Sequence, residues 1–122
     1  GTTSTNGLKL YIDGVLNVQG TAGSIGINSY TSTEVTIGAV TNGGQWRLEG
    51  NIDEVALWNT DESANASAIY NSGVPNDISS LSPLSWWRCG DGDTSPTLTD
   101  NGSGGNDGTM QNFTTFSTDV PT

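Results

Sequence analysis

The sequence has no histidine and a single cysteine, Cys89, and these absences narrow its chemistry. Without histidine the chain lacks the commonest general base, the commonest metal ligand and every Ser-His or Cys-His nucleophilic pair. One cysteine forms neither an internal disulfide nor a cysteine-based zinc site, which favours its interpretation as a small buried hydrophobe. We therefore expect a protein that is not an enzyme.

Basic residues are almost as scarce, because 3 Lys and Arg stand against 13 Asp and Glu and give a net charge of −10. Such a chain is repelled by nucleic acid and by anionic lipid, so we expect neither as a partner. The sequence contains no apolar run long enough to span a membrane. It begins with Gly1 and shows no signal-peptide pattern, so we expect a processed product or part of a longer chain.

Large apolar residues are few, with 24 Leu, Ile, Val and Phe among 122 residues, whereas Gly, Ser, Thr and Asn are abundant. This composition does not make long helices and leaves a thin core. A length near 120 residues fits one domain, residues 1–122. We expect that domain to consist of short strands and many turns.

The clearest local pattern is Leu8–Gln19, in which two β-rich runs flank Asp13-Gly14 and predict a hairpin with a type I′ turn. One short helix is expected from an N-cap near Thr60 or Ser63 to a stop at Gly73. The other expected strands are residues 34–38, 45–49, 51–58, 84–89, 97–99, 109–111 and 113–120. Strands at this spacing predict an all-β fold, an antiparallel β-sandwich with one short helix.

Two passages resemble the laminin-G-like, concanavalin A-like jelly-roll family. Leu8–Val15, followed by Gly50–Trp58, the short helix and Ile69–Gly73, makes residues 1–75 similar to the second half of such a domain. Trp86-Trp87-Arg88 with Leu98–Thr109 is similar to the family's opening strand motif.

That second passage places the opening motif in residues 84–122, after the closing one. A jelly roll brings its first and last strands side by side, so the reversed order is that of a permuted or incomplete sandwich.

The segment from Trp86 to Pro121 also resembles the carboxyl end of structural proteins of tailed marine phages, whose laminin-G-like domains decorate the virion. This resemblance implies a structural or decoration module of a larger assembly, on a virion surface or otherwise extracellular. Its partners would be other copies of itself or other structural proteins. The alternative is a carbohydrate- or cell-surface-binding adhesion module of a secreted protein, with glycans as ligands.

Four acidic residues lie amid Gly and Asn in the last third of the chain, and they are Asp91, Asp93, Asp100 and Asp107. Carboxylate oxygens on a flexible loop are the ligands that Ca²⁺ prefers, so these residues are a candidate calcium site. Their spacing matches no complete calcium loop. Asp and Asn before Gly are also ordinary turn residues, and the turn interpretation is favoured.

The Trp and Tyr residues offer a candidate sugar-binding platform, namely Trp46, Trp58, Trp86, Trp87, Tyr11, Tyr30 and Tyr70. Among them we single out Trp46, Trp86 and Trp87. Packing in the core is the alternative, and neighbours in a strand point to opposite faces, so at most one of Trp86 and Trp87 is exposed on a given face. The carboxylates Glu49 and Asp53 invite comparison with sandwich glycosidases. They lie too far apart along an extended strand for a retaining pair, which again argues against an enzyme.

Overall fold

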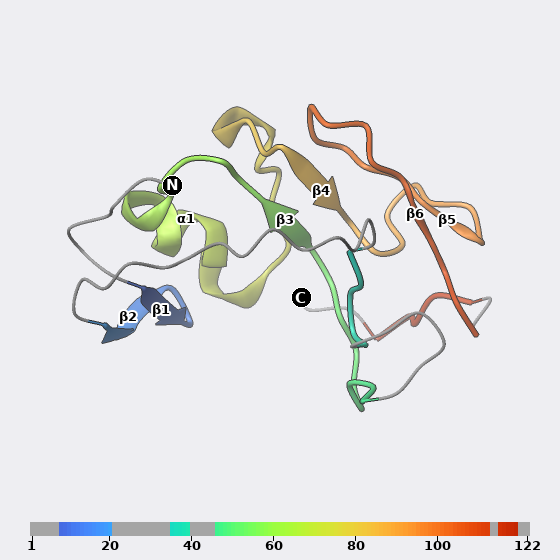
Figure 1. Cartoon of the computed structure of the whole chain (residues 1–122), viewed down its shortest axis with the longest axis horizontal. Coiled ribbons are helices and arrows are strands. Elements are labelled where there is room, and N and C mark those ends of the chain that lie inside the picture. Colours follow the sequence, from blue (N-terminus) through green and yellow to red (C-terminus); the bar gives the residue numbers. More distant parts are fainter. Residues whose placement is uncertain (1–7, 21–34, 40–45, 113–114, 120–122) are drawn as a thin grey trace.

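The computed structural model describes residues 8–20, 35–39, 46–112 and 115–119 (Figure 1). Its strands are β1 (Lys9–Ile12), β2 (Val15–Gln19), β3 (Val55–Leu57), β4 (Ser85–Trp87), β5 (Thr97–Leu98) and β6 (Gly108–Thr109). They pair as three two-stranded antiparallel sheets, β1–β2, β3–β4 and β5–β6. With the short helix α1 (Ala66–Tyr70), the described part of the chain has the all-β antiparallel character that the sequence predicts.

The sheets follow one another along the long axis of the molecule (Figure 1). The β1–β2 hairpin lies at one end beside α1, the β3–β4 pair occupies the middle, and β5–β6 lies toward the other end. No helix among the described residues is long and apolar enough to cross a membrane.

The predicted hairpin is confirmed. Asp13 and Gly14 have φ angles of 51° and 72°, which are the two left-handed conformations that a type I′ turn requires. The register pairs Leu10 with Val18 and Ile12 with Val15, with an irregularity after Leu10. The conformational preferences of the turn residues therefore determine where this hairpin forms.

The helical segment begins as a 3₁₀ turn, Ser63–Asn65 (η1), and continues as α1. Its N-cap residue is Glu62, whose side chain makes no capping hydrogen bond, although the sequence predicted an N-cap near Thr60 or Ser63. In the turn before it, Asp61 Oδ1 accepts the N–H of Ser63 at 2.9 Å. Asn71, at φ 44°, ends α1 in a left-handed conformation, and the chain turns once more through the 3₁₀ segment Asn71–Gly73 (η2). A further 3₁₀ turn, Ser79–Leu81 (η3), precedes β4.

The core is small, as the composition predicts. Among the described residues, the buried apolar side chains are those of Ile78, Trp86, Trp87 and Met110. Two of these belong to β4, all of whose residues are buried. β4 is therefore the strand around which the middle of the molecule packs.

Three predicted strands are wrong where the structure describes them. Residues 35–38 and 46–49 form no strand, although the N–H of Leu48 donates to the carbonyl of Gly38 at 2.8 Å. Gly38 and Trp46 have φ angles of 77° and 59°, and these positive values interrupt an extended ladder. The segment 115–119 is also not a strand, but Phe116 packs against Gly90.

The hairpin turn touches α1 at Gly14, where an added Cβ would lie 3.0 Å from Tyr70 Cβ and 3.1 Å from Ser67 Cα. We expect Gly14→Ala to lower the free energy of unfolding by about 1–3 kcal/mol, because it combines a positive φ with a clash against the helix. Gly20→Ala is the matched control, since a Cβ there meets only ordinary contacts at 3.6 Å. Urea unfolding of the two variants checks this, and equal stabilities would contradict the docking of hairpin on helix.

Candidate functional site

The two tryptophans of β4, predicted as binding residues, are core residues. Trp86 and Trp87 are 5% and 6% exposed. The indole N–H of Trp86 donates to Glu54 Oε2 at 2.5 Å, and that of Trp87 donates to the carbonyl of Asn106 at 2.9 Å. Neither ring is available for stacking on a sugar, so the platform hypothesis is wrong for this pair and the core-packing alternative holds.

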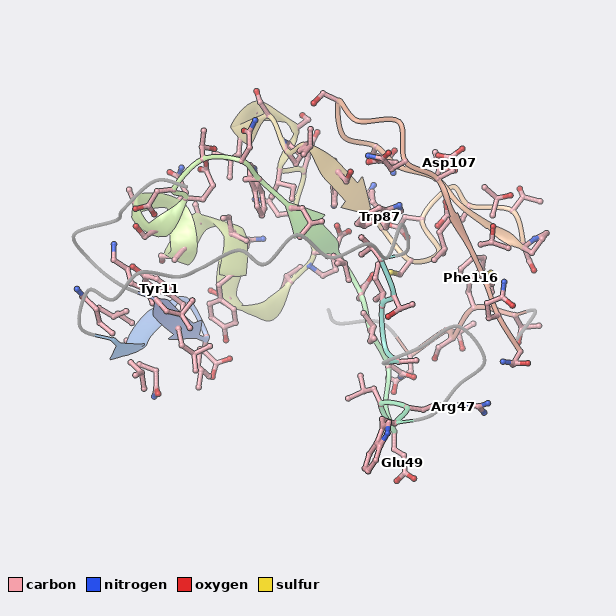
Figure 2. The ribbon with its side chains drawn as sticks, in the orientation of Figure 1. Tyr11, Arg47, Glu49, Trp87, Asp107 and Phe116 are labelled. Carbon is pink, nitrogen blue, oxygen red and sulfur yellow. The ribbon has the colours of Figure 1, made fainter. Side chains whose placement is uncertain are left out.

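Trp46, the third predicted binding residue, lies in a different environment. Its side chain is 80% exposed, and its neighbours Arg47 and Glu49 lie on a segment that projects from the body of the molecule (Figure 2). The structure therefore does not bring the three predicted tryptophans together, and binding by Trp46 stays a prediction.

Arg88 connects β4 to its surroundings through two carboxylates. Its Nε lies 3.0 Å from Glu54 Oε1 and its Nη2 lies 2.7 Å from Oδ2 of Asp91, one of the four candidate calcium ligands. Its guanidinium carbon also lies 5.2 Å from the ring centre of Trp86. Partial burial opposes the charge, but the hydrogen bond with Glu54 and the nearby negative charges outweigh it and raise the pKa of Arg88.

The other candidate calcium ligands hold turns. The carboxylate of Asp93 accepts the N–H of Gly90 at 3.0 Å and that of Thr99 at 2.8 Å. The carboxylate of Asp107 accepts the N–H of Asp100 at 2.9 Å. Aspartate side chains that accept nearby backbone N–H groups stabilise turns, which is the role that the sequence favoured for these residues.

Asp100 is the most engaged of the four and is 8% exposed. Its Oδ1 accepts the N–H groups of Trp86 and Gly102, both at 2.8 Å, and its Oδ2 accepts the N–H of Asn106 at 2.7 Å. Burial alone would raise the pKa of Asp100, but these backbone hydrogen bonds stabilise the charged form and lower the pKa below its ordinary value. One carboxylate thus ties β4 to the loop between β5 and β6.

Calcium binding stays a prediction. Within the described ranges, no group of three or more His, Cys, Asp or Glu side chains is arranged to hold a metal ion. Each of the four aspartates instead has at least one carboxylate oxygen bonded to a backbone N–H group or to a guanidinium.

Cys89 lies two residues after β4 and is half-buried, and its Sγ is 3.6 Å from the carbonyl oxygen of Trp87. Burial and the negative charge of Asp53 raise the pKa of the thiol. A thiol that stays protonated at neutral pH is a poor nucleophile. This fits the interpretation of Cys89 as a small hydrophobe.

A hollow surface lies where the hairpin, the residues after β3 and α1 meet. It consists of two adjoining depressions of about 330 and 750 Å³, and both are lined by Trp58, Ile69 and Tyr70. Tyr11 of β1 (labelled in Figure 2) lines the larger one. We call this surface the aromatic groove. The remaining wall residues used below are Lys9, Asn59, Asp61 and Glu62 on the larger depression and Asp53, Glu54 and Asn76 on the smaller.

The aromatic groove has a fixed floor and an acidic rim. The indole N–H of Trp58 donates to the carbonyl of Leu81 at 3.1 Å, which fixes the ring. The Ser63 hydroxyl and N–H lower the pKa of Asp61, and Thr60 with Asn65 lowers that of Glu62. Both rim acids are therefore charged at neutral pH.

The sequence-based platform included the aromatic residues that line the groove but singled out others, Trp46, Trp86 and Trp87. Trp58 follows β3 and Tyr70 ends α1, so they meet only when strand and helix pack together. Tyr11 alternates with exposed aliphatic residues in β1, which places its ring on the opposite face of the hairpin. That alternation is the one signal in the sequence that could have separated Tyr11 from its neighbours.

One known family matches the first part of the chain. Residues 1–69 match the model of the concanavalin A-like lectin/glucanases superfamily, and they include the hairpin, β3 and most of α1. The chain belongs to this superfamily. No curated protein and no solved structure matches it. The match covers most of the first of the two passages that resemble a laminin-G-like domain and stops before the second.

The name of the superfamily covers both sugar-binding and sugar-cleaving proteins, so the carboxylates of this member matter. Glu54 has one oxygen on the indole of Trp86 and the other on the guanidinium of Arg88. Oδ1 of Asp53 accepts the N–H of Glu54 at 3.0 Å. A glycosidase needs one carboxyl group free to donate a proton and a second free to attack or to activate water. The described geometry of these two acids instead serves structure.

Proposed function

We propose that this concanavalin A-like domain is a non-enzymatic structural or decoration module of a larger assembly, of the kind found on a virion surface. The observation that carries this proposal is the outward-facing apolar surface of the β1–β2 hairpin. Its partners would be other copies of the chain or other structural proteins, and its location a virion surface or another extracellular surface.

In the hairpin, the aliphatic side chains face solvent and the polar ones face the rest of the molecule, the reverse of the usual arrangement in a surface sheet. Along β1, Lys9 and Tyr11 are half-buried on the side of the aromatic groove, whereas Leu10 and Ile12 are 51% and 50% exposed. The amine of Lys9 reaches Ser63 Oγ at 3.0 Å, which holds the polar side of the strand against the start of the helical segment. The aliphatic side therefore faces solvent.

The strand register extends this apolar side across the hairpin. Leu10 pairs with Val18 and Ile12 with Val15, and directly paired residues share a face. We call the exposed set the outer face, and it consists of Leu8, Leu10, Ile12, Val15 and Val18, which are 50–71% exposed. Burying these side chains would contribute on the order of 5 kcal/mol. A contiguous apolar patch of this kind marks an interaction surface.

Charge shapes which contacts the outer face makes. The face itself contains no charged residue, whereas the whole chain carries a net charge of −10. Contact between copies through this face keeps carboxylates out of the interface but still brings two acidic molecules together. Added salt should therefore strengthen such contact, whereas it would weaken contact with a basic partner.

We expect the purified chain to self-associate at micromolar concentration in sedimentation velocity, and Leu10→Asn to weaken association by at least about tenfold, a loss of about 1.4 kcal/mol. Leu84→Asn is the control, because Leu84 is 42% exposed and lies outside the hairpin. A cooperatively melting monomer at all salt concentrations would contradict the assembly proposal, as would equal effects of the two variants.

The aromatic groove favours a second candidate function, a carbohydrate-binding adhesion module. Tyr11, Trp58 and Tyr70 offer ring surfaces, and the rim supplies charged carboxylates and amide groups, such as those of Asn59 and Asn76. Apolar ring faces with a few polar acceptors are the usual combination for a sugar, whose C–H faces stack while its hydroxyls donate.

A glycan screen followed by titration calorimetry tests this candidate. We expect saturable binding that Tyr70→Ala weakens by about two- to twelvefold, because stacking on one ring contributes roughly 0.5–1.5 kcal/mol. Trp46→Ala is the matched control, since Trp46 is 80% exposed and does not line the groove. Circular dichroism checks that both variants fold. Binding that Trp46→Ala removes and Tyr70→Ala spares would place the site elsewhere and reject the groove.

A further inference from the structure

Asn101 is exposed and is followed by Gly102. A following glycine makes the side-chain amide of an asparagine most accessible to attack by the main-chain nitrogen. In deamidation the main-chain nitrogen of residue 102 attacks Cγ of Asn101, the bond from Cγ to the side-chain nitrogen breaks, and ammonia leaves with the proton of the attacking nitrogen. Water then opens the five-membered succinimide to aspartate or isoaspartate. Gly promotes the attack because it has no Cβ to obstruct it.

The fold does not allow Gly102 to be replaced. A Cβ at this position would lie 2.6 Å from both the carbonyl oxygen of Leu84 and Cα of Ser85, which is shorter than any real contact. The loop between β5 and β6 therefore crosses the residues before β4 so closely that only glycine fits. The susceptible dipeptide is a consequence of this packing.

The same loop engages both reacting groups in other hydrogen bonds. The N–H of Gly102 donates to Asp100 Oδ1 at 2.8 Å, so the nitrogen that must attack is directed at a carboxylate. The negative charge of that carboxylate also opposes loss of the N–H proton. The leaving group is held as well, because Nδ2 of Asn101 donates to the carbonyl of Thr99 at 3.2 Å and to that of Trp86 at 3.4 Å.

We propose that Asn101-Gly102 is a deamidation site that the Asp100 carboxylate holds closed in the folded chain. Local opening of the loop releases the Gly102 nitrogen and permits the reaction. An isoaspartate product adds one atom to the main chain between Asp100 and Gly102, so the loop cannot return to its original bonds. The N–H of Asn101, which donates to the carbonyl of Trp86 at 2.7 Å, is then displaced from β4. The modification is therefore a one-way change that loosens the central strand.

Peptide mass spectrometry after incubation in mildly alkaline buffer tests this proposal by the gain of about 1 Da at residue 101. We expect the folded wild type to react at least about tenfold more slowly than the same chain in urea, because reaction requires local opening. Asp100→Ala should react nearly as fast as the chain in urea. Asp107→Ala is the matched control, since it removes a carboxylate of the same loop that does not contact Gly102. Asn101→Gln should abolish the signal.

Circular dichroism shows whether Asp100→Ala is folded. If it is not folded, hydrogen exchange of the wild type provides the test. The proposal requires that the Gly102 amide is protected from exchange in the folded chain. It also requires that conditions that raise the exchange rate of this amide raise the rate of deamidation. Equal deamidation of the folded wild type and the chain in urea would overturn the proposal. Equal acceleration by Asp100→Ala and Asp107→Ala, with both variants folded, would also overturn it.

Discussion

The carboxylate of Asp100 is the interaction on which the middle of the molecule depends. It accepts three backbone N–H groups, and they come from β4, from Gly102 and from Asn106. β4 in turn pairs with β3, whose approach brings Glu54 to Trp86 and Arg88. A buried charge is stable only when its hydrogen bonds are satisfied, so this loop must keep its shape for β4 to stay in place. A chain with so few large apolar residues obtains order here from polar bonds that a larger core would make unnecessary.

The two faces of the β1–β2 hairpin belong to two different surfaces of the molecule. One face supplies Tyr11 to the aromatic groove and is held to the helical segment by Lys9 and by the close contact at Gly14. The outer face is aliphatic and open. Because strand residues alternate between faces, one short sequence contributes Tyr11 to the aromatic groove and an apolar surface to the opposite side. The proposed assembly and the proposed glycan ligand therefore do not compete for the same side chains.

Local chemistry made much of the fold predictable, and tertiary packing made the rest unpredictable. Asp13-Gly14 specifies its turn by itself, and the aspartates of the last third are the turn residues their spacing suggests. Residues 35–38 and 46–49 have a strand-like pattern, yet positive φ angles interrupt them. Alternation places Trp86 and Trp87 on opposite faces, but it does not say that both faces of β4 are covered. The sequence likewise does not show that the groove's aromatic residues meet, because Tyr11 lies in β1, Trp58 follows β3 and Tyr70 ends α1.

The pKa of the Asp100 carboxyl group, followed by NMR titration of its side-chain carbon in the folded protein, tests this account most directly. Three backbone donors should hold that pKa below the ordinary aspartate value although the group is buried. The stability that Asp100 contributes is then present above the unfolded-state pKa and is lost as the pH falls through the lower, folded-state pKa. A pKa at or above the ordinary value would show that desolvation outweighs the hydrogen bonds and would contradict the central role of Asp100.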